Sequence, residues 1–232
     1  MSKAQAMVFA AGRGTRMGAL TETVPKPLLS LQQETLLDYT LEEVRRAGFQ
    51  RVVVNHSYLG AQIVAHLSYR PGITLSAEPE PLETGGGLKA ALPYLSAGPI
   101  LTTNSDTVFA EGPSPISPMV RSWRPGMGAL LLVSPIKRVQ EYTGKGDFDM
   151  APGQQLAFRG DAPFAPFVFT GVQIIDPVWV KAHQERVWSL REVWRKMAPE
   201  RALYGFIHDA DWVDTGTPAG LEAARALRSR SL

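Results

Sequence analysis

The N-terminal segment 8–17 combines an apolar run with a glycine-rich turn, and it constrains the fold of this 232-residue chain more than any other stretch. Residues 8–10 are apolar, as a strand buried on both faces of a parallel sheet requires. Gly12 and Gly14 follow, and glycine permits positive φ angles and a close approach of the backbone to a ligand. Consecutive N–H groups in such a turn can surround anionic oxygens. The segment therefore predicts a parallel α/β sheet with an anion-binding turn after its first strand.

Three cationic side chains accompany this turn. Arg13 and Arg16 lie within it and can donate paired hydrogen bonds to phosphate. Lys26 follows between two prolines, which restrict its backbone. The dinucleotide fingerprint does not fit, because its third glycine would come one place late, and the P-loop does not fit, because the sequence lacks Gly-Lys-Ser/Thr. A surface turn with a few arginines is the alternative, but the strand, glycines and cations together favour a triphosphate site.

Composition limits the classes of protein to which the chain can belong. At 232 residues and 44% hydrophobic content, it can bury one sizeable core, and we expect a single domain over 1–232. The formal net charge of +2 disfavours a nucleic-acid-binding surface. The lack of cysteine excludes disulfides and thiolate metal sites. No stretch reads as a membrane span or signal peptide, so we expect a cytoplasmic monomer or homodimer with no membrane partner.

Strand-like and helix-like patterns alternate along the chain. Further strands are predicted at 51–54, 73–77, 99–103, 129–133, 167–175 and 203–208. Leu37, Leu41 and Val44 recur at helical spacing, and a second helix is predicted at 58–67 with Val64 facing inward. This alternation predicts a doubly wound, mostly parallel sheet, whose ligands lie at the carboxyl ends of the strands. A further apolar stripe reads as core: Trp188, Leu190, Val193, Trp194 and Met197.

The glycine turn and the Pro-Lys-Pro-Leu run that starts at Pro25 together resemble the signature of sugar-1-phosphate nucleotidylyltransferases. Those enzymes join a nucleoside triphosphate to a sugar 1-phosphate and release pyrophosphate. The resemblance implies a Rossmann-like nucleotidyltransferase fold, with a nucleotide-binding half at about 1–110 and a small sugar-binding β lobe within about 111–232. It implies that Arg16 and Lys26 stabilise charge during transfer. It also implies that the turn holds the triphosphate through Ala10, Ala11, Gly12, Gly14 and Thr15.

A second glycine cluster, at 78–87, reads Glu-Pro-Glu-Pro-Leu-Glu-Thr-Gly-Gly-Gly. From the residues alone it is either a helix start capped by Thr84 or a slot in which a flat ring or backbone approaches the glycines. Its Leu-Glu-Thr-Gly run resembles the family's base-reading loop. That resemblance implies that backbone groups near Leu82, Thr84 and Gly85 meet the base and that Glu78 faces it.

The same cluster is most similar to a compact subgroup of the family. The subgroup includes bacterial N-acetylmuramate-1-phosphate uridylyltransferases, which serve cell-wall recycling, and some mannose-1-phosphate guanylyltransferase-like proteins. Carboxylates do not separate the two bases, because the uracil N3–H and the guanine N1–H both need an acceptor. The short chain and the Asn-His-x-x-Leu-Gly run at 55–60 favour uracil, and therefore UTP.

Two carboxylates are candidate Mg²⁺ ligands. Asp106 follows the strand predicted at 99–103, where a carboxylate can hold the ion against phosphates, although strand-terminal aspartates often only form turns. The resemblance implies that Asp214, before Thr-Gly-Thr-Pro, is the second ligand, with a structural turn as the alternative. Asp211 lies close in sequence but is not expected to bind the metal. Thr217 is predicted to cap the last helix.

The residues that bind the sugar are predicted from weaker patterns. Gly146 and Asp147 lie in a Thr-Gly-x-Gly-Asp run that resembles the family's sugar-binding turn, but the residues fit a plain hairpin loop equally well. Thr170 and Gly171 lie inside the strand at 167–175, where a glycine indicates a bulge or a close ligand. The family often carries Glu-Lys-Pro soon after the turn, and this chain does not.

Together these patterns predict an enzyme that makes an NDP-sugar from an NTP and a sugar 1-phosphate, with UTP and N-acetylmuramate 1-phosphate preferred. Transfer of guanylyl to mannose 1-phosphate is the alternative within the family. A catalytically silent nucleotide-sugar-binding module is the alternative from another class, and it would be favoured if either metal-binding aspartate pointed away from the pocket. The chain lacks the hexapeptide repeats of bifunctional family members, so we expect it to act alone or with a separate partner.

Overall fold

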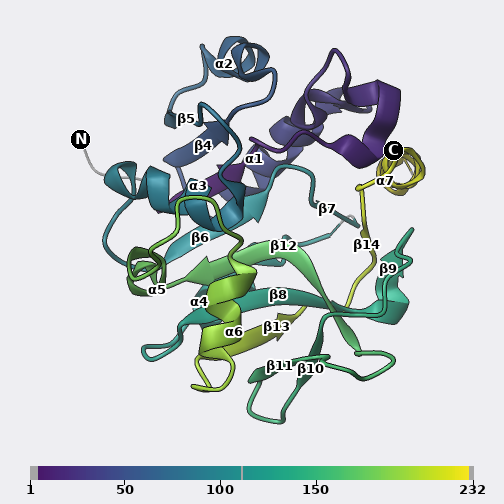
Figure 1. Ribbon diagram of the computed structural model, residues 1–232. Coiled ribbons are helices and arrows are strands. Elements are labelled where there is room, and N and C mark those ends of the chain that lie inside the picture. The colour runs from purple at the N-terminus through teal and green to yellow at the C-terminus, as the bar shows by residue number, and fades with distance from the viewer. Residues whose placement is uncertain (1–4, 111, 230–232) are drawn as a thin grey trace.

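The computed structural model describes residues 5–110 and 112–229, and a nine-stranded sheet runs through its centre (Figure 1). Along its main path the strands follow the spatial order β11 (Leu156–Phe158), β10 (Phe148–Met150), β12 (Phe167–Ile175), β6 (Ile100–Asn104), β1 (Ala6–Phe9), β4 (Val52–His56) and β5 (Ile73–Ala77). The sheet branches at β12, which also pairs with β8 (Ala129–Pro135), and β8 pairs in turn with β13 (Leu203–Ile207).

The direction of the strands changes at β12. Strands β5, β4, β1 and β6 all run parallel, whereas β12 is antiparallel to β6 and to β8. Ala6, Met7 and Val8 of β1 are all buried, as expected of a strand covered on both faces. The doubly wound, mostly parallel sheet is therefore confirmed. Because β12 comes from the second half of the chain and β6 from the first, one continuous sheet joins both halves.

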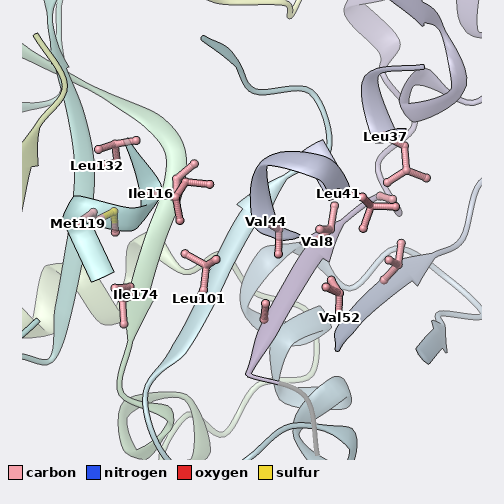
Figure 2. Close-up of a cluster of buried hydrophobic side chains, with 14 of the residues drawn as sticks. Val8, Leu37, Leu41, Val44, Val52, Leu101, Ile116, Met119, Leu132 and Ile174 are labelled. Atoms are coloured by element: carbon pink, nitrogen blue, oxygen red, sulfur yellow. The ribbon is translucent and has the colours of Figure 1, made fainter. Parts of the chain in front are cut away.

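Helices cover both faces of this sheet, and alternate residues of β1 point into two hydrophobic cores. The helices over one face are α1 (Leu36–Arg46), α2 (Gly60–Leu67) and α4 (Ile116–Ser122). Figure 2 shows Leu41 and its neighbours on α1 above Val8 and Val52 of the sheet. Met7 belongs to the opposite core. The helices over that face are α3 (Glu83–Ala91), α5 (Pro177–Lys181) and α6 (Arg191–Met197).

Two neighbouring helices show where local sequence was and was not sufficient. Helix α1 begins with a capping box, in which Thr35 and Asp38 each accept a side-chain bond from the other's backbone N–H at 3.1 Å. The prediction for α2 is partly wrong, because Val64 is 37% exposed. Ile63 and Leu67 take the inward positions. A helix of only eight residues at the edge of the sheet buries one narrow stripe.

The predicted core stripe at 188–197 is confirmed, since all five of its apolar residues are buried.

The C-terminal helix α7 (Pro218–Ser229) lies beside the N-terminal turn, although the two are far apart in sequence (Figure 1). Leu221 shares a small core with Met17 of the turn. Thr217 caps α7 as predicted, because its hydroxyl oxygen accepts a backbone N–H at 3.1 Å. The elements not yet named are η1 (Thr15–Thr21), η2 (Lys26–Leu28), β2 (Ser30–Leu31), β3 (Glu34–Thr35), η3 (Leu92–Tyr94), β7 (Val108–Phe109), η4 (Ile136–Arg138), β9 (Val139–Gln140) and β14 (Trp212–Val213). Among the described residues, every helix is too short or too polar to cross a bilayer.

Candidate active site

The glycine turn begins where β1 ends and closes on Lys26. The N–H of Ala10 donates to Asn55 Oδ1 at 2.8 Å, which fixes the start of the turn to the end of β4. Gly14 has a φ of +64°, and a Cβ placed there would lie 2.9 Å from Cβ of Lys26. Both facts require glycine. A Cβ on Gly12, in contrast, would meet nothing within 4 Å, so this residue faces open space.

A cavity of about 420 Å³ lies over the carboxyl ends of the central strands, where this turn begins. Of the nine residues predicted to bind the nucleotide, six line the cavity: Ala11, Gly12, Gly14, Thr15, Glu78 and Thr84. Arg16, Lys26 and Asp106 line it as well. The three remaining predicted residues, Ala10, Leu82 and Gly85, lie behind its wall. The position of the cavity is the one expected for a ligand of a doubly wound sheet.

A second, smaller hollow of about 210 Å³ adjoins the first on the side of β12. Arg16, Asn104 and Asp106 line both spaces, so the two meet at these residues. Three of the four residues predicted to bind sugar line the smaller hollow: Asp147, Thr170 and Gly171. We call the larger space the nucleotide cavity and the smaller one the sugar hollow, after the ligands that the sequence predicts for the residues that line them.

Two cations and two carboxylates lie where these spaces meet. Lys26 is only 8% exposed, and its Nζ contacts Oδ2 of Asp106. Arg16 Nη1 lies 3.9 Å from Oδ2 of Asp214, which lines the sugar hollow. Thr215 links the two aspartates, because its hydroxyl donates to the carbonyl oxygen of Asp106. Neither carboxylate therefore points away from the site. A carboxylate that pointed away would have favoured a catalytically silent binding module.

Asp106 and Asp214 supply the type of oxygen ligand that Mg²⁺ uses. This ion is commonly held by one or two carboxylates together with substrate phosphates and water, so the pair fits it. In the described part of the chain, no group of three or more histidine or acidic side chains could hold a metal by itself. Asp211 lies outside both spaces, as predicted, and pairs with Arg138 at 3.5 Å.

The loop at 82–86 was predicted to read the base and is called the base-reading loop for that reason; a distant segment of the same chain holds it. The N–H groups of Gly85 and Gly86 donate to the carbonyl oxygen of Trp188 at 2.9 and 3.1 Å, and a Cβ on Gly85 would lie 2.2 Å from the indole ring. The flat ring that approaches the glycines is thus the chain's own. The prediction that Thr84 caps α3 is wrong, because its hydroxyl instead accepts the N–H of Leu190 at 3.0 Å.

Glu78 is buried and connects three parts of the nucleotide cavity. Its two carboxylate oxygens accept the side-chain amide of Asn55 at 2.6 Å and the N–H of Leu82 at 3.0 Å. Asn55 in turn holds the glycine turn through Ala10. Asn55 and Asn104 were not among the predicted site residues, although both are polar and lie at the carboxyl end of a buried strand. Ligands of a doubly wound sheet bind at the carboxyl ends of its strands, so this position could have indicated both asparagines.

The sugar hollow depends on a bulge in β12. The register of β12 against β8 shifts between Phe169 and Gln173, which fits the bulge that was one of the two alternatives predicted at Gly171. Gly171 has a φ of +95°, and a Cβ there would lie 2.7 Å from Thr107 Oγ1. Tyr142 also lines the hollow. Burial raises the pKa of its phenol, and the negative charge of Asp147 raises this pKa further.

The loop at 143–147 packs against the following segment and against α6. Gly146 does not line the hollow; its φ is +80°, and a Cβ there would overlap the carbonyl oxygen of Ala165. Asp147 Oδ2 accepts the N–H of Phe169 at 3.1 Å, and Oδ1 lies 3.1 Å from Nη1 of Arg191. No local pattern marked Arg191 as a partner of Asp147, which is 44 residues away in the sequence.

Comparison with known proteins agrees with this geometry. Residues 6–142, more than half of the chain, match the family model of the MobA-like NTP transferase domain. An N-acetylmuramate alpha-1-phosphate uridylyltransferase from Caulobacter vibrioides is 31% identical over 95% of both chains. Another with this name, from Neisseria meningitidis serogroup B, is 32% identical over 96% of this chain and 97% of its own.

More distant similarities also extend over most of the chain. A mannose-1-phosphate guanyltransferase beta-A from Xenopus laevis is 27% identical over 92% of this chain and 61% of its own length. A crystal structure from Bacillus anthracis, of a protein provisionally assigned as a glucose-1-phosphate thymidylyltransferase, superposes with a TM-score of 0.83 over 98% of this chain and 96% of its own, at 15% identity. This last likeness shows the fold alone. The family match and the two nearly full-length relatives show that the chain belongs to the sugar-1-phosphate nucleotidyltransferases, with a MobA-like NTP transferase domain.

Proposed function

We propose that the protein transfers the uridylyl group of UTP to N-acetylmuramate 1-phosphate, giving UDP-N-acetylmuramate and pyrophosphate. The observation that carries the proposal is that the nucleotide cavity and the sugar hollow meet at Arg16, Asn104 and Asp106. A triphosphate in one space and a sugar phosphate in the other would bring their reacting phosphates together there. The choice of UTP and N-acetylmuramate rests on the two relatives that match nearly the whole chain.

In the proposed reaction, an oxygen of the sugar phosphate attacks the α-phosphorus of UTP in line with the departing pyrophosphate. One P–O bond forms and the α–β bridging P–O bond breaks. The attacking phosphate is already anionic, so the protein needs to position and neutralise charge rather than remove a proton. In this proposal the buried Lys26 donates to the α-phosphoryl oxygens, and Arg16 with the glycine-turn amides holds the pyrophosphate; their lining of the nucleotide cavity supports these roles.

We propose that Asp106 and Asp214 bind Mg²⁺ during this reaction. When bound, the ion would offset the negative charge of the phosphate oxygens. The aspartates have further contacts that keep them in place. Oδ1 of Asp214 accepts the N–H of Gly216 at 3.0 Å, and Thr215 bonds the backbone of Asp106. The first contact orients the carboxylate of Asp214 and the second holds the backbone of Asp106 before substrates arrive, which avoids part of the reorganisation cost.

The test is pyrophosphate release in the presence of Mg²⁺, with UTP, GTP, dTTP, CTP and ATP each combined with the 1-phosphates of N-acetylmuramate, N-acetylglucosamine, glucose and mannose. The proposal expects the highest kcat/KM for UTP with N-acetylmuramate 1-phosphate. Preferred turnover of GTP with mannose 1-phosphate would replace it with the guanylyl alternative. Nucleotide binding by folded protein without turnover in any combination would indicate a silent module.

A further inference from the structure

Arg191, the first residue of α6, does not itself line the sugar hollow but contacts a residue that does, and we call this position the rim of the hollow. Its Nη1 is 3.1 Å from Oδ1 of Asp147, and Asp147 lines the hollow. The other oxygen of Asp147 accepts the N–H of Phe169 on β12. The guanidinium is therefore one side chain away from the space that the sugar would occupy, and its position is fixed relative to the strand that forms the wall.

The guanidinium retains capacity to bind a ligand. Arginine carries five N–H donors, and the described structure shows one hydrogen bond from this side chain, the bond to Asp147. The side chain is 43% exposed. Its guanidinium carbon lies 5.7 Å from the centre of the Phe158 ring, a cation–π contact that holds it at the rim. A guanidinium held in place by two contacts can bind a carboxylate with little loss of entropy.

The charges around the sugar hollow favour a further cation, such as Arg191, for the binding of an acidic sugar. Three aspartates line the hollow, at 106, 147 and 214, and only Arg16 among its lining residues is cationic. Arg16 and Lys26 are needed for the phosphates under the proposed function. Because the proposed Mg²⁺ would offset the charges of Asp106 and Asp214, the charge that remains beside the sugar is that of Asp147, and an anionic group on the sugar would be repelled by it unless a further cation lay near.

Other basic residues near the hollow are less suitable than Arg191. Arg195 lies one turn further along α6 at a similar distance, 5.8 Å, from the same Phe158 ring, but it forms no ion pair with Asp147 among the described contacts. Arg159 uses its Nη1 to bond the carbonyl oxygen of Ala162. Arg191 thus differs from its neighbours in its direct contact with a side chain that lines the hollow.

We propose that Arg191 determines specificity for the acidic substituent of the sugar by binding its carboxylate. The inference rests on the proposed function. N-acetylmuramate differs from N-acetylglucosamine by a lactic acid group, ether-linked at O3, that carries a carboxylate. The hollow has a volume of only about 210 Å³, and in this proposal the substituent extends past the sugar ring towards Asp147 and Arg191, where the fork of donors on Arg191 pairs with both carboxylate oxygens.

The experiment compares N-acetylmuramate 1-phosphate with N-acetylglucosamine 1-phosphate at saturating UTP and Mg²⁺. If the second sugar is not turned over, its inhibition constant against the first reports its binding. For Arg191→Ala we expect kcat/KM with the first sugar to fall about tenfold to a hundredfold, mainly through KM, as for loss of a charge-assisted hydrogen bond. The value for the second sugar should change by less than about threefold. Arg191→Lys should restore part of the loss, because it retains the charge but not the fork.

Arg195→Ala is the matched control, because it removes a cation from the same helix and the same aromatic ring. Its kinetics with both sugars should resemble those of the wild type. Equal losses with both sugars in Arg191→Ala would overturn the inference and leave Arg191 a structural partner of Asp147. No loss with either sugar would also overturn it. A wild-type enzyme that rejects N-acetylmuramate 1-phosphate would instead overturn the proposed function, and this inference with it.

Discussion

Substitution of Lys26 tests the charge chemistry of the proposed site most sharply. The ammonium is buried at 8% exposure, lines the nucleotide cavity and contacts Asp106. Removing one preorganised donor from such a site costs about 2.7–4 kcal/mol in the transition state, which corresponds to about a hundredfold to a thousandfold in kcat. We therefore expect Lys26→Ala to lower kcat by about this factor. Lys26→Arg should retain part of the activity, because the charge remains.

The effect on folding should be smaller than the effect on turnover. Breaking a fully buried ion pair costs about 3–5 kcal/mol, but the Asp106 side chain is 26% exposed and can be hydrated after the substitution. Thermal unfolding should therefore still show a cooperative transition for Lys26→Ala. This measurement separates a chemical defect from loss of the fold.

The assay is single-turnover formation of UDP-sugar, with UTP affinity measured separately by calorimetry. Arg13→Ala is the control, because Arg13 lies in the same turn but outside the nucleotide cavity, with its guanidinium 5.1 Å from the ring of Tyr58. Its kcat should remain within about threefold of the wild type. A Lys26→Ala enzyme with kcat within tenfold of the wild type would refute the reasoning, because a buried cation would then contribute little to transfer.

Three further changes have distinct expected outcomes. Asp214→Asn should raise the Mg²⁺ concentration at half-maximal activity at least tenfold, whereas Asp211→Asn should not, and equal Mg²⁺ titrations would contradict the proposed metal site. Gly171→Ala should lower the free energy of unfolding by about 1–3 kcal/mol, because alanine would be strained at a φ of +95° and would crowd Thr107; denaturant titration measures this, and an unchanged midpoint would contradict it. Burial lowers the pKa of His208 in the folded protein, so this imidazole binds a proton more readily in the unfolded state. The free energy of unfolding should therefore fall as the pH drops below 6.5, the ordinary pKa of the imidazole. His208→Gln should reduce that loss of stability between pH 7 and 5, and parallel curves for the two proteins would argue against it.

Local patterns were sufficient where neighbouring residues determine the structure. The apolar run before the glycine turn forms β1, the threonine before the last helix caps it, and Gly171 forms a bulge. In each case the physical requirement lies within a few residues: burial on both faces, an unpaired N–H at a helix start, or a positive φ. Asp106 was selected because it follows a predicted strand, whereas Asp214 was selected from the resemblance of the motif that it precedes.

Contacts between distant residues left no such local sign. Thr84 could be recognised as a possible cap, but its actual partner, Leu190, is 106 residues away. The glycines of the base-reading loop fit around Trp188, which the sequence indicated only as core. The contact between Arg191 and Asp147 likewise depends on how α6 packs against the loop at 143–147. Identifying these contacts required the tertiary arrangement, because residue type and spacing do not encode which segments meet.

The central claim is that one reaction takes place where the nucleotide cavity and the sugar hollow meet. A crystal structure of the protein with UDP-N-acetylmuramate and Mg²⁺ tests it most directly. We expect uridine in the nucleotide cavity, the sugar in the hollow bounded by Asp147 and Gly171, and the diphosphate beside Arg16 and Asp106. A product whose sugar lies outside the hollow, or whose diphosphate lies away from Asp106, would contradict the account.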